Sequence, residues 1–202
     1  MRMYYVFPVI LKSYFSKSGY MHCISWNCGG SFHTKFEALE SYGADVWVIQ
    51  ECEDPARYPD SVLSQRFPIH LWKGDNPHKG LGVFVTRPMA LQKLDWSDEY
   101  QGHKVKYFLP CLLEKEIKLL AVWTHRNQSP NFGYIGQFWK YLQTNGHLFN
   151  RIIIPGDFNS NVRWDEWDRW WNHSDVVRLL EERDIHSFYH LHTQEKQGQE
   201  SQ

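Results

Sequence analysis

The chain has 202 residues, 42% of them hydrophobic, which is ordinary for a single globular domain with a sizeable core. Its 22 Lys and Arg residues nearly balance its 23 Asp and Glu residues, so the net charge excludes a strong general attraction to nucleic acid, and any basic groove must be local. Four cysteines with no CxxC pair and no histidine at zinc-finger spacing argue against a structural zinc site and against a secreted disulfide framework.

The N-terminal 20 residues differ in pattern from the rest of the chain. They contain basic residues, no acidic residue and no clear hydrophobic period, so we interpret residues 1–20 as an extension that is disordered or arises from an upstream start. The apolar run from Tyr4 to Leu11 is too short to span a bilayer, and Pro8 interrupts it. We therefore expect no membrane contact. Thiols in predicted buried strands indicate a reducing, cytoplasmic compartment.

From residue 21 onward, strand and helix patterns alternate, which is typical of a layered α/β domain. A helix is expected from Lys35 to Tyr42, with Phe36 and Leu39 facing inward and Gly43 ending it. The strands expected in this half of the chain cover residues 23–26, 46–50, 68–72 and 81–86, followed by a hairpin of 106–113 and 117–124.

The second half of the chain alternates in the same way. The pattern predicts a helix over 132–147, a strand over 152–155, and a helix over 175–182 capped by Ser174. The last ten residues are polar, and we expect this tail to be disordered. The chain is also rich in aromatic residues, which predicts a ring-rich core; Trp164, Trp167, Trp170 and Trp171 are expected to form a packed stripe rather than a nucleic-acid platform.

Three predicted strands end in polar side chains. Asn27 precedes two glycines, and Glu51 ends a continuous apolar run. Taken alone, a turn explains the first and a solvent-facing sheet edge explains the second. The third strand end is more specific, because Gly156 permits a tight exit from the strand, and Asp157 and Asn159 alternate with a phenylalanine so that both point one way. A carboxylate and an amide in this arrangement can hold a water and a phosphate oxygen.

Five short motifs follow one another along the chain: Trp26-Asn27, Gln50-Glu51, Gly80-Leu81-Gly82-Val83, Thr124-His125 and Gly156-Asp157-Phe158-Asn159. Each is weak alone, but five in this order resemble the endonuclease/exonuclease/phosphatase superfamily, which includes abasic-site endonucleases and deoxyribonuclease I-like enzymes. The resemblance covers about residue 21 to the C-terminus. It implies an α/β (α+β) four-layer sandwich, in which two packed mixed β-sheets are flanked by helices.

The resemblance also implies catalytic roles. Glu51 resembles the family's principal metal ligand, with Asn27 beside it on the metal or the scissile phosphate. Hard oxygen donors of this kind suit Mg²⁺ or Mn²⁺. Asp157 resembles the carboxylate that orients or activates the attacking water, and Asn159 resembles the amide that positions the phosphate.

The remaining candidate residues are basic. His125 matches a family histidine that hydrogen-bonds phosphate or protonates a leaving oxygen; the alternative is a surface imidazole that stabilises a loop. Arg126 follows it and is a candidate phosphate contact, although an exposed Arg in a loop is usually only solvated. Four further basic residues flank the middle strands and could bind phosphates, but scattered basic residues mostly lie on the surface: Lys73, His78, Lys79 and Arg87.

The chain departs from the family pattern near its C-terminus. It lacks a strand bearing an Asp and a final Ser-Asp-His motif; Ser187-Phe188-Tyr189-His190 resembles the segment that normally precedes them, and we interpret His190 as a packing residue. The resemblance therefore implies a C-terminally truncated domain at 21–192 that lacks its last strands, with the polar tail 193–202 leading toward them. We expect weak or absent activity from this polypeptide by itself, and prefer a gene fragment to a specialised inactive subunit.

The leading functional hypothesis is a metal-dependent endo- or exonuclease that cleaves DNA by in-line attack of an activated water. Nucleic acid is then the expected partner, and the oligomeric state is open. A second hypothesis is a phosphatase or phosphodiesterase with a lipid or nucleotide substrate, because the same core serves both. A third is a catalytically inactive binding module, which the missing C-terminal motif favours.

Overall fold

The computed structural model describes residues 7–11, 21–129 and 131–200, with the backbone alone for 7–11. The chain forms two compact units. The first consists of Met1–Asp95, Tyr107–Trp123 and Arg151–Asp157, and the second of Trp96–Lys106, Thr124–Asn150 and Phe158–Gln202. Among the described residues, no helix has the length and apolarity that crossing a membrane requires.

Two mixed β-sheets form the centre of the first unit. One has the strand order β1-β2-β3-β5-β4, in which only the β2–β3 pair is parallel. Its strands are β1 Phe7–Leu11, β2 Met21–Asn27, β3 Val46–Cys52, β4 Ile69–Asn76 and β5 Lys79–Val85. The other has the order β11-β10-β9-β6, with β12 also paired to β10. Its strands are β6 Leu91–Lys93, β9 Phe108–Leu113, β10 Ile117–Trp123, β11 Ile152–Ile153 and β12 Gly156–Asp157.

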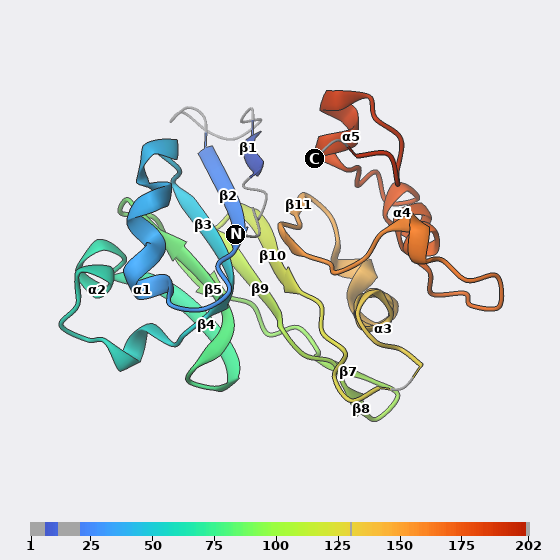
Figure 1. Ribbon diagram of the computed structural model, residues 1–202, viewed down its shortest axis with the longest axis horizontal. Coiled ribbons are helices and arrows are strands. Elements are labelled where there is room, and N and C mark those ends of the chain that lie inside the picture. Colours follow the sequence, from blue (N-terminus) through green and yellow to red (C-terminus); the bar gives the residue numbers. More distant parts are fainter. Residues whose placement is uncertain (1–6, 12–20, 130, 201–202) are drawn as a thin grey trace. The chain divides into compact units, whose positions relative to one another are not determined.

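The first sheet is buried on both faces, which explains the continuous apolar run of β3. One face packs against the second sheet in a core that includes Val48, Val83, Leu109 and Leu119. The other face packs against helices through Trp47 and Phe84, among others. Figure 1 shows α1 and α2 on one side of this sheet and β9 and β10 on the other. These helical segments are α1 Phe32–Lys35, η1 Phe36–Tyr42, η2 Pro55–Arg57 and α2 Val62–Arg66.

The second unit is built mainly from helices. Its longest helix, α3, buries Phe138, Tyr141 and Leu142. Phe132 stacks on Trp171 at a centroid distance of 4.1 Å, which links the segments before α3 and before α4. The elements of this unit are β7 Glu99–Tyr100, β8 His103–Lys104, α3 Ile135–Asn145, η3 Gly146–Leu148, η4 Val162–Trp164, α4 His173–Glu181 and α5 Phe188–Thr193.

The fold class expected from the resemblance is confirmed, with mixed sheets and flanking helices. The β9–β10 hairpin is also confirmed; Glu114 and Lys115 in its turn both have positive φ, as in a type I′ turn, and the Glu116 N–H donates to the Leu113 carbonyl at 3.0 Å. Phe36 and Leu39 are buried and Gly43 ends their segment at φ 57°, but that segment is a 3-10 helix. Part of the N-terminal extension forms β1, and the expectation for residues 1–6 and 12–20 lies outside the described residues.

Two expectations for the C-terminal region were wrong. The cap of α4 is Asn172, whose backbone N–H donates to Asp175 Oδ2 at 3.0 Å, and Ser174 lies within the first turn. The tail is ordered through Glu200, because its polar side chains find partners: His173 Nε2 lies 2.5 Å from Gln197 Oε1, and Asn161 Nδ2 donates to Glu200 Oε2 at 3.2 Å. The expectation for residues 201–202 lies outside the described residues.

The tryptophan stripe was also predicted wrongly. Trp171 is 8% exposed and packs on Phe132, but Trp164, Trp167 and Trp170 are 64%, 98% and 62% exposed. The reason is local structure, because the helical spacing of these residues is not matched by a helix. Residues 165–172 form turns and bends between η4 and α4, so only one ring of the four reaches the interior.

Candidate active site

Asn27 lies at the end of β2, directly beside Gln50 on the parallel neighbour β3. Its side-chain orientation is set locally, because the Gly29 N–H donates to Asn27 Oδ1 at 3.1 Å. With the carbonyl oxygen held in this way, the Nδ2 group points toward two carboxylates. It donates to Asp157 Oδ2 at 2.8 Å and to Glu51 Oε1 at 3.2 Å. One amide therefore joins two acidic residues that are far apart in the sequence.

Glu51 reaches this position through an irregularity in β3. Its φ is 61°, in the left-handed region, and the register with β5 shifts between Gln50 and Cys52. A residue other than glycine in this conformation costs about 1–2 kcal/mol, so the surrounding sheet must hold it there. Bulges of this kind re-aim a side chain. Here, Gln50 stays buried and donates to Ser25 Oγ at 3.0 Å, while Glu51 is left half-buried beside Asn27.

Asp157 is positioned by the short strand β12, which pairs in parallel with the end of β10 so that Asp157 lies opposite Trp123. This approach requires a glycine next to it. A Cβ on Gly156 would lie 2.1 Å from the carbonyl oxygen of Val122, a distance that no side chain tolerates. Gly156 thus allows the strand to come close enough to place Asp157 against Asn27.

A lysine side chain also contacts this cluster. Lys79, the first residue of β5, places Nζ 2.6 Å from Glu51 Oε2. Its side chain is about half-exposed, so the ion pair lies at the solvent edge of the sheet. From the sequence, Lys79 could bind phosphate but was expected to be an ordinary surface residue. The available signal was its position, because it directly precedes the glycine-rich motif on the strand that neighbours β3.

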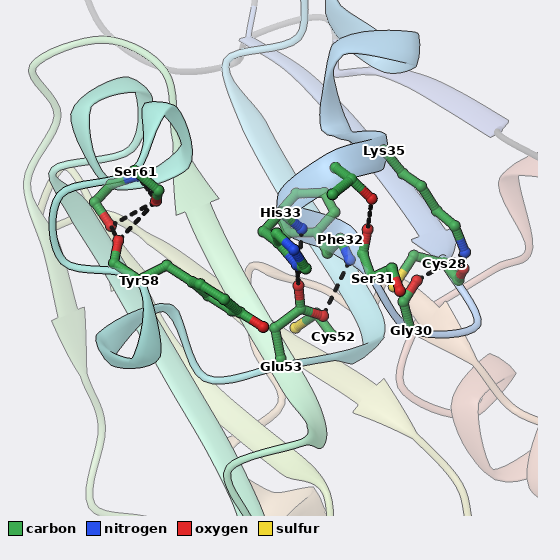
Figure 2. A network of polar contacts seen from close by, with 12 residues as sticks. Cys28, Gly30, Ser31, Phe32, His33, Lys35, Cys52, Glu53, Tyr58 and Ser61 are labelled. Carbon is green, nitrogen blue, oxygen red and sulfur yellow. Dashed lines mark hydrogen bonds and ion pairs between the residues drawn. The ribbon is translucent and has the colours of Figure 1, made fainter.

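A second carboxylate, Glu53, lies two residues after Glu51 and points toward Phe32 and His33 at the start of α1 (Figure 2). It is 3% exposed and accepts hydrogen bonds from the backbone N–H groups of Phe32, at 3.0 Å, and His33, at 2.8 Å, and contacts His33 Nδ1. Burial by itself raises the pKa of Glu53, but the hydrogen bonds from His33, its own backbone and Phe32 outweigh burial and hold the pKa below its ordinary value. Sequence reasoning missed this residue. The one feature of the sequence that could have indicated Glu53 is its position just after the strand end, where a charged side chain that becomes buried needs partners.

The other predicted site residues belong to the second unit. His125 is exposed; its Nδ1 accepts the Asn127 N–H at 3.2 Å, and its carbonyl accepts the Tyr134 N–H at 3.0 Å. Asn159, with φ 43°, donates from Nδ2 to the Thr124 carbonyl at 3.1 Å. Arg126 is exposed. The residues following β10 and those following β12 are therefore tied to each other within the second unit.

The structure thus brings together Asn27, Glu51 and Asp157 in the first unit. Within the described residues, no three His, Cys, Asp or Glu side chains form a metal-binding cluster. The carboxylates of Glu51 and Asp157 are nevertheless hard oxygen donors that suit Mg²⁺, which keeps several of its waters and uses only one or two carboxylates. The Asn27 oxygen accepts the Gly29 N–H, and it is the Nδ2 group of Asn27 that faces the two carboxylates. By the chemistry of this donor set, the residues present fit such an ion.

Comparisons with known proteins give similarity in structure alone. No family model matches the chain, and no curated protein matches its sequence. The human Nocturnin catalytic domain, solved with bound sulfate, superposes with a TM-score of 0.55 at 13% identity, over 93% of this chain and 77% of that one. An AP endonuclease from Archaeoglobus fulgidus superposes with a TM-score of 0.50 at 14% identity, over 80% of this chain and 69% of that one. TDP2 from D. rerio, complexed with a single-strand DNA product, superposes with a TM-score of 0.51 at 15% identity, over 79% of this chain and 64% of that one.

These three proteins share one architecture, and the chain spans 64–77% of their lengths. At such low identity the likeness establishes the fold and nothing finer. The chain has the fold of the endonuclease/exonuclease/phosphatase superfamily, as the order of its motifs predicted.

Proposed function

We propose that this protein is a metal-dependent phosphodiester hydrolase, and that its substrate is DNA, which it cleaves as an endo- or exonuclease. The single observation that carries the proposal is the Asn27 amide, which donates to both Glu51 and Asp157 at the edge of the first sheet. If these residues only stabilised the fold, there would be no need for two carboxylates to share one hydrogen-bond donor at a partly open surface. The same arrangement is what hydrolysis of a phosphate ester needs, because it concentrates oxygen ligands and a base at one point.

Each residue of the cluster has a proposed task. Glu51 would hold the divalent ion, Mg²⁺ or Mn²⁺, and Asn27 would keep Glu51 and Asp157 at a fixed separation. When bound, the ion would take up charge on the phosphate and lower the pKa of a bound water. Asp157 would orient the attacking water and accept its proton. Lys79, at 2.6 Å from Glu51, is close enough to place a positive charge near a phosphate oxygen.

The second unit supplies the remaining candidates. We propose that Asn159 and Arg126 contact the substrate phosphate, and that His125 donates a hydrogen bond or a proton to the leaving oxygen. Asn159 is held by the Thr124 carbonyl, so a change at either strand end would move both. Arg126 is exposed and therefore free to contact a polyanion.

DNA is preferred over other phosphate esters for one reason. Two of the structural neighbours are an AP endonuclease and a separate protein, TDP2, that was solved with a single-strand DNA product. A phosphatase or phosphodiesterase acting on a lipid or nucleotide remains the second candidate, because the cluster by itself recognises only a phosphate. The reducing, cytoplasmic compartment expected from the sequence is part of the same proposal, supported by four free and buried cysteines.

The test uses the full chain with plasmid DNA, a labelled oligonucleotide, a nucleotide and a phosphoinositide, each with Mg²⁺, with Mn²⁺ and with EDTA. We expect weak DNA cleavage that requires the metal and falls at least about 100-fold in Glu51→Gln and in Asp157→Asn. Matched controls are Glu37→Gln and Asp60→Asn, which make the same chemical changes at exposed positions. Equal rates in all four variants, or no metal-dependent hydrolysis of any phosphate ester, would overturn the proposal.

A further inference from the structure

The loop between β2 and α1 has an unusual backbone. Gly29, Gly30 and Ser31 have φ of 61°, 86° and 56°, three left-handed residues in succession. Ser31 is not a glycine, so its conformation must be held by bonds elsewhere in the loop. This loop directly follows Asn27, and its Gly29 N–H fixes the orientation of the Asn27 amide. Whatever holds the loop therefore also determines where Nδ2 of Asn27 points.

Lys35 holds the middle of the loop. Its Nζ donates to the Cys28 carbonyl at 2.9 Å and to the Gly30 carbonyl at 2.7 Å, although the residue itself is exposed (Figure 2). The start of the loop is tied to the sheet by the Cys28 N–H, which donates to the Gln50 carbonyl at 3.0 Å. An ammonium group bound to two backbone carbonyls fixes their separation more firmly than neutral contacts do.

Glu53 holds the far end of the loop. Its carboxylate accepts the first free N–H groups of α1, those of Phe32 and His33, and so occupies the position that a capping side chain usually takes. The N-cap residue Ser31 makes no such bond with its own side chain. The His33 ring contacts the same carboxylate and stacks on Tyr58 at a centroid distance of 4.2 Å. Glu53 is therefore held both by backbone N–H groups and by the His33 ring.

We propose that Lys35 and Glu53 are positioning residues that aim the Asn27 amide at Glu51 and Asp157. The two glutamates after β3 then have separate tasks: Glu51 faces the cluster, and Glu53 holds the loop that carries its partner. The consequence for rate rests on the proposed function. The consequence for the direction of the amide does not, because it concerns only hydrogen bonds within the protein.

The test follows the Asn27 side-chain amide by NMR in protein labelled with ¹⁵N-asparagine, with its cross-peaks assigned from their loss in Asn27→Ala. We expect Lys35→Met and Glu53→Gln to shift or split the Asn27 cross-peaks. Those of Asn145, whose amide is buried and bonded to the Ser97 carbonyl, should stay in place. Lys35→Arg keeps donors at similar reach and should restore the wild-type peaks. Lys93→Met, the same change at an exposed site, is the matched control.

Rates provide the second measurement. If the protein hydrolyses phosphodiesters, Lys35→Met should lower kcat about tenfold and leave KM within about twofold, as expected for misplacement of a group near the reacting atoms. Shifted Asn27 peaks in a chain without hydrolysis would support the positioning role and count against the proposed function alone. Unchanged Asn27 peaks in folded Lys35→Met would overturn the positioning role. This variant decides the question even if Glu53→Gln does not fold, because Lys35 lies on the surface.

Discussion

Two regions of this protein are rich in aromatic residues but have opposite surroundings. In the first unit, a ring cluster made of Phe32, Phe36, Trp47, Phe67 and Phe84 is almost fully buried. In the second unit, the tryptophan segment 164–171 contains four indoles, of which only Trp171 is buried. Aromatic content alone therefore does not distinguish a core from a surface. The difference lies in the backbone that carries the rings.

The ring cluster is buried because regular elements place its members on facing surfaces. Trp47 and Phe84 lie opposite each other on neighbouring strands of one sheet, and Phe32 lies in α1, on the same side of that sheet. The rings meet mainly edge to face, as in the Trp47–Phe67 pair at 5.0 Å and 62°. The tryptophan segment has turns in place of a helix, so its spacing aligns no common face. Helical spacing predicts a packed stripe only where a helix forms.

The largest expected effect tests the first half of this comparison. Phe67→Ala removes a fully buried ring that contacts Phe32, Trp47 and Phe84. We expect the free energy of unfolding to fall by about 3–5 kcal/mol, measured by urea denaturation, because the lost contacts leave a cavity. A loss below about 1 kcal/mol would mean that the cluster is loosely packed and that the contrast between the two regions is weaker than the structure indicates.

A smaller effect is expected from the carboxylate that anchors this cluster. Glu53→Ala leaves the backbone N–H groups of Phe32 and His33 without their acceptor in a buried place. We expect a loss of about 2–3 kcal/mol in the free energy of unfolding, because unsatisfied buried donors are costly. Glu37→Ala, at an exposed position of the adjoining 3-10 helix, should change stability by less than about 0.5 kcal/mol. Equal losses in the two variants would contradict the anchoring role.

The buried cluster illustrates what sequence can and cannot predict. The strands that carry Trp47 and Phe84 were predicted because apolar runs of that length are typical of buried strands. Glu51 and Asp157 were identified as candidates because each ends such a strand. Glu53 was not identified, and Lys79 was expected to be an ordinary surface residue although it could bind phosphate. The importance of both depends on a bulge at Glu51 and on the pairing of β3 with β5. Such features are tertiary, and they determine which of several nearby charged residues faces the site.

Acid should weaken the anchor of the ring cluster gradually. The folded-state pKa of Glu53 lies below its ordinary value of 4.5. Its contribution to stability is therefore complete above about pH 4.5 and is lost as the pH falls through the lower, folded-state pKa. We expect the difference in unfolding free energy between the wild type and Glu53→Gln to stay constant from pH 7 to about pH 5 and to shrink below that. A difference that grows on acidification would contradict the lowered pKa.

The smallest expected effect tests the other half of the comparison. Trp167→Ala deletes an indole that is nearly fully exposed, so the free energy of unfolding should change by about 0.5 kcal/mol or less. Acrylamide should quench the wild-type fluorescence more than that of this variant, because the deleted indole is the most accessible one described. Trp171→Ala is the matched substitution at a buried position in the same segment, where loss of the stack on Phe132 should lower stability by several kcal/mol. If the two substitutions lower the free energy of unfolding equally, the four tryptophans must pack as a stripe after all. The turns between η4 and α4 would then be the wrong explanation for the exposure of the segment.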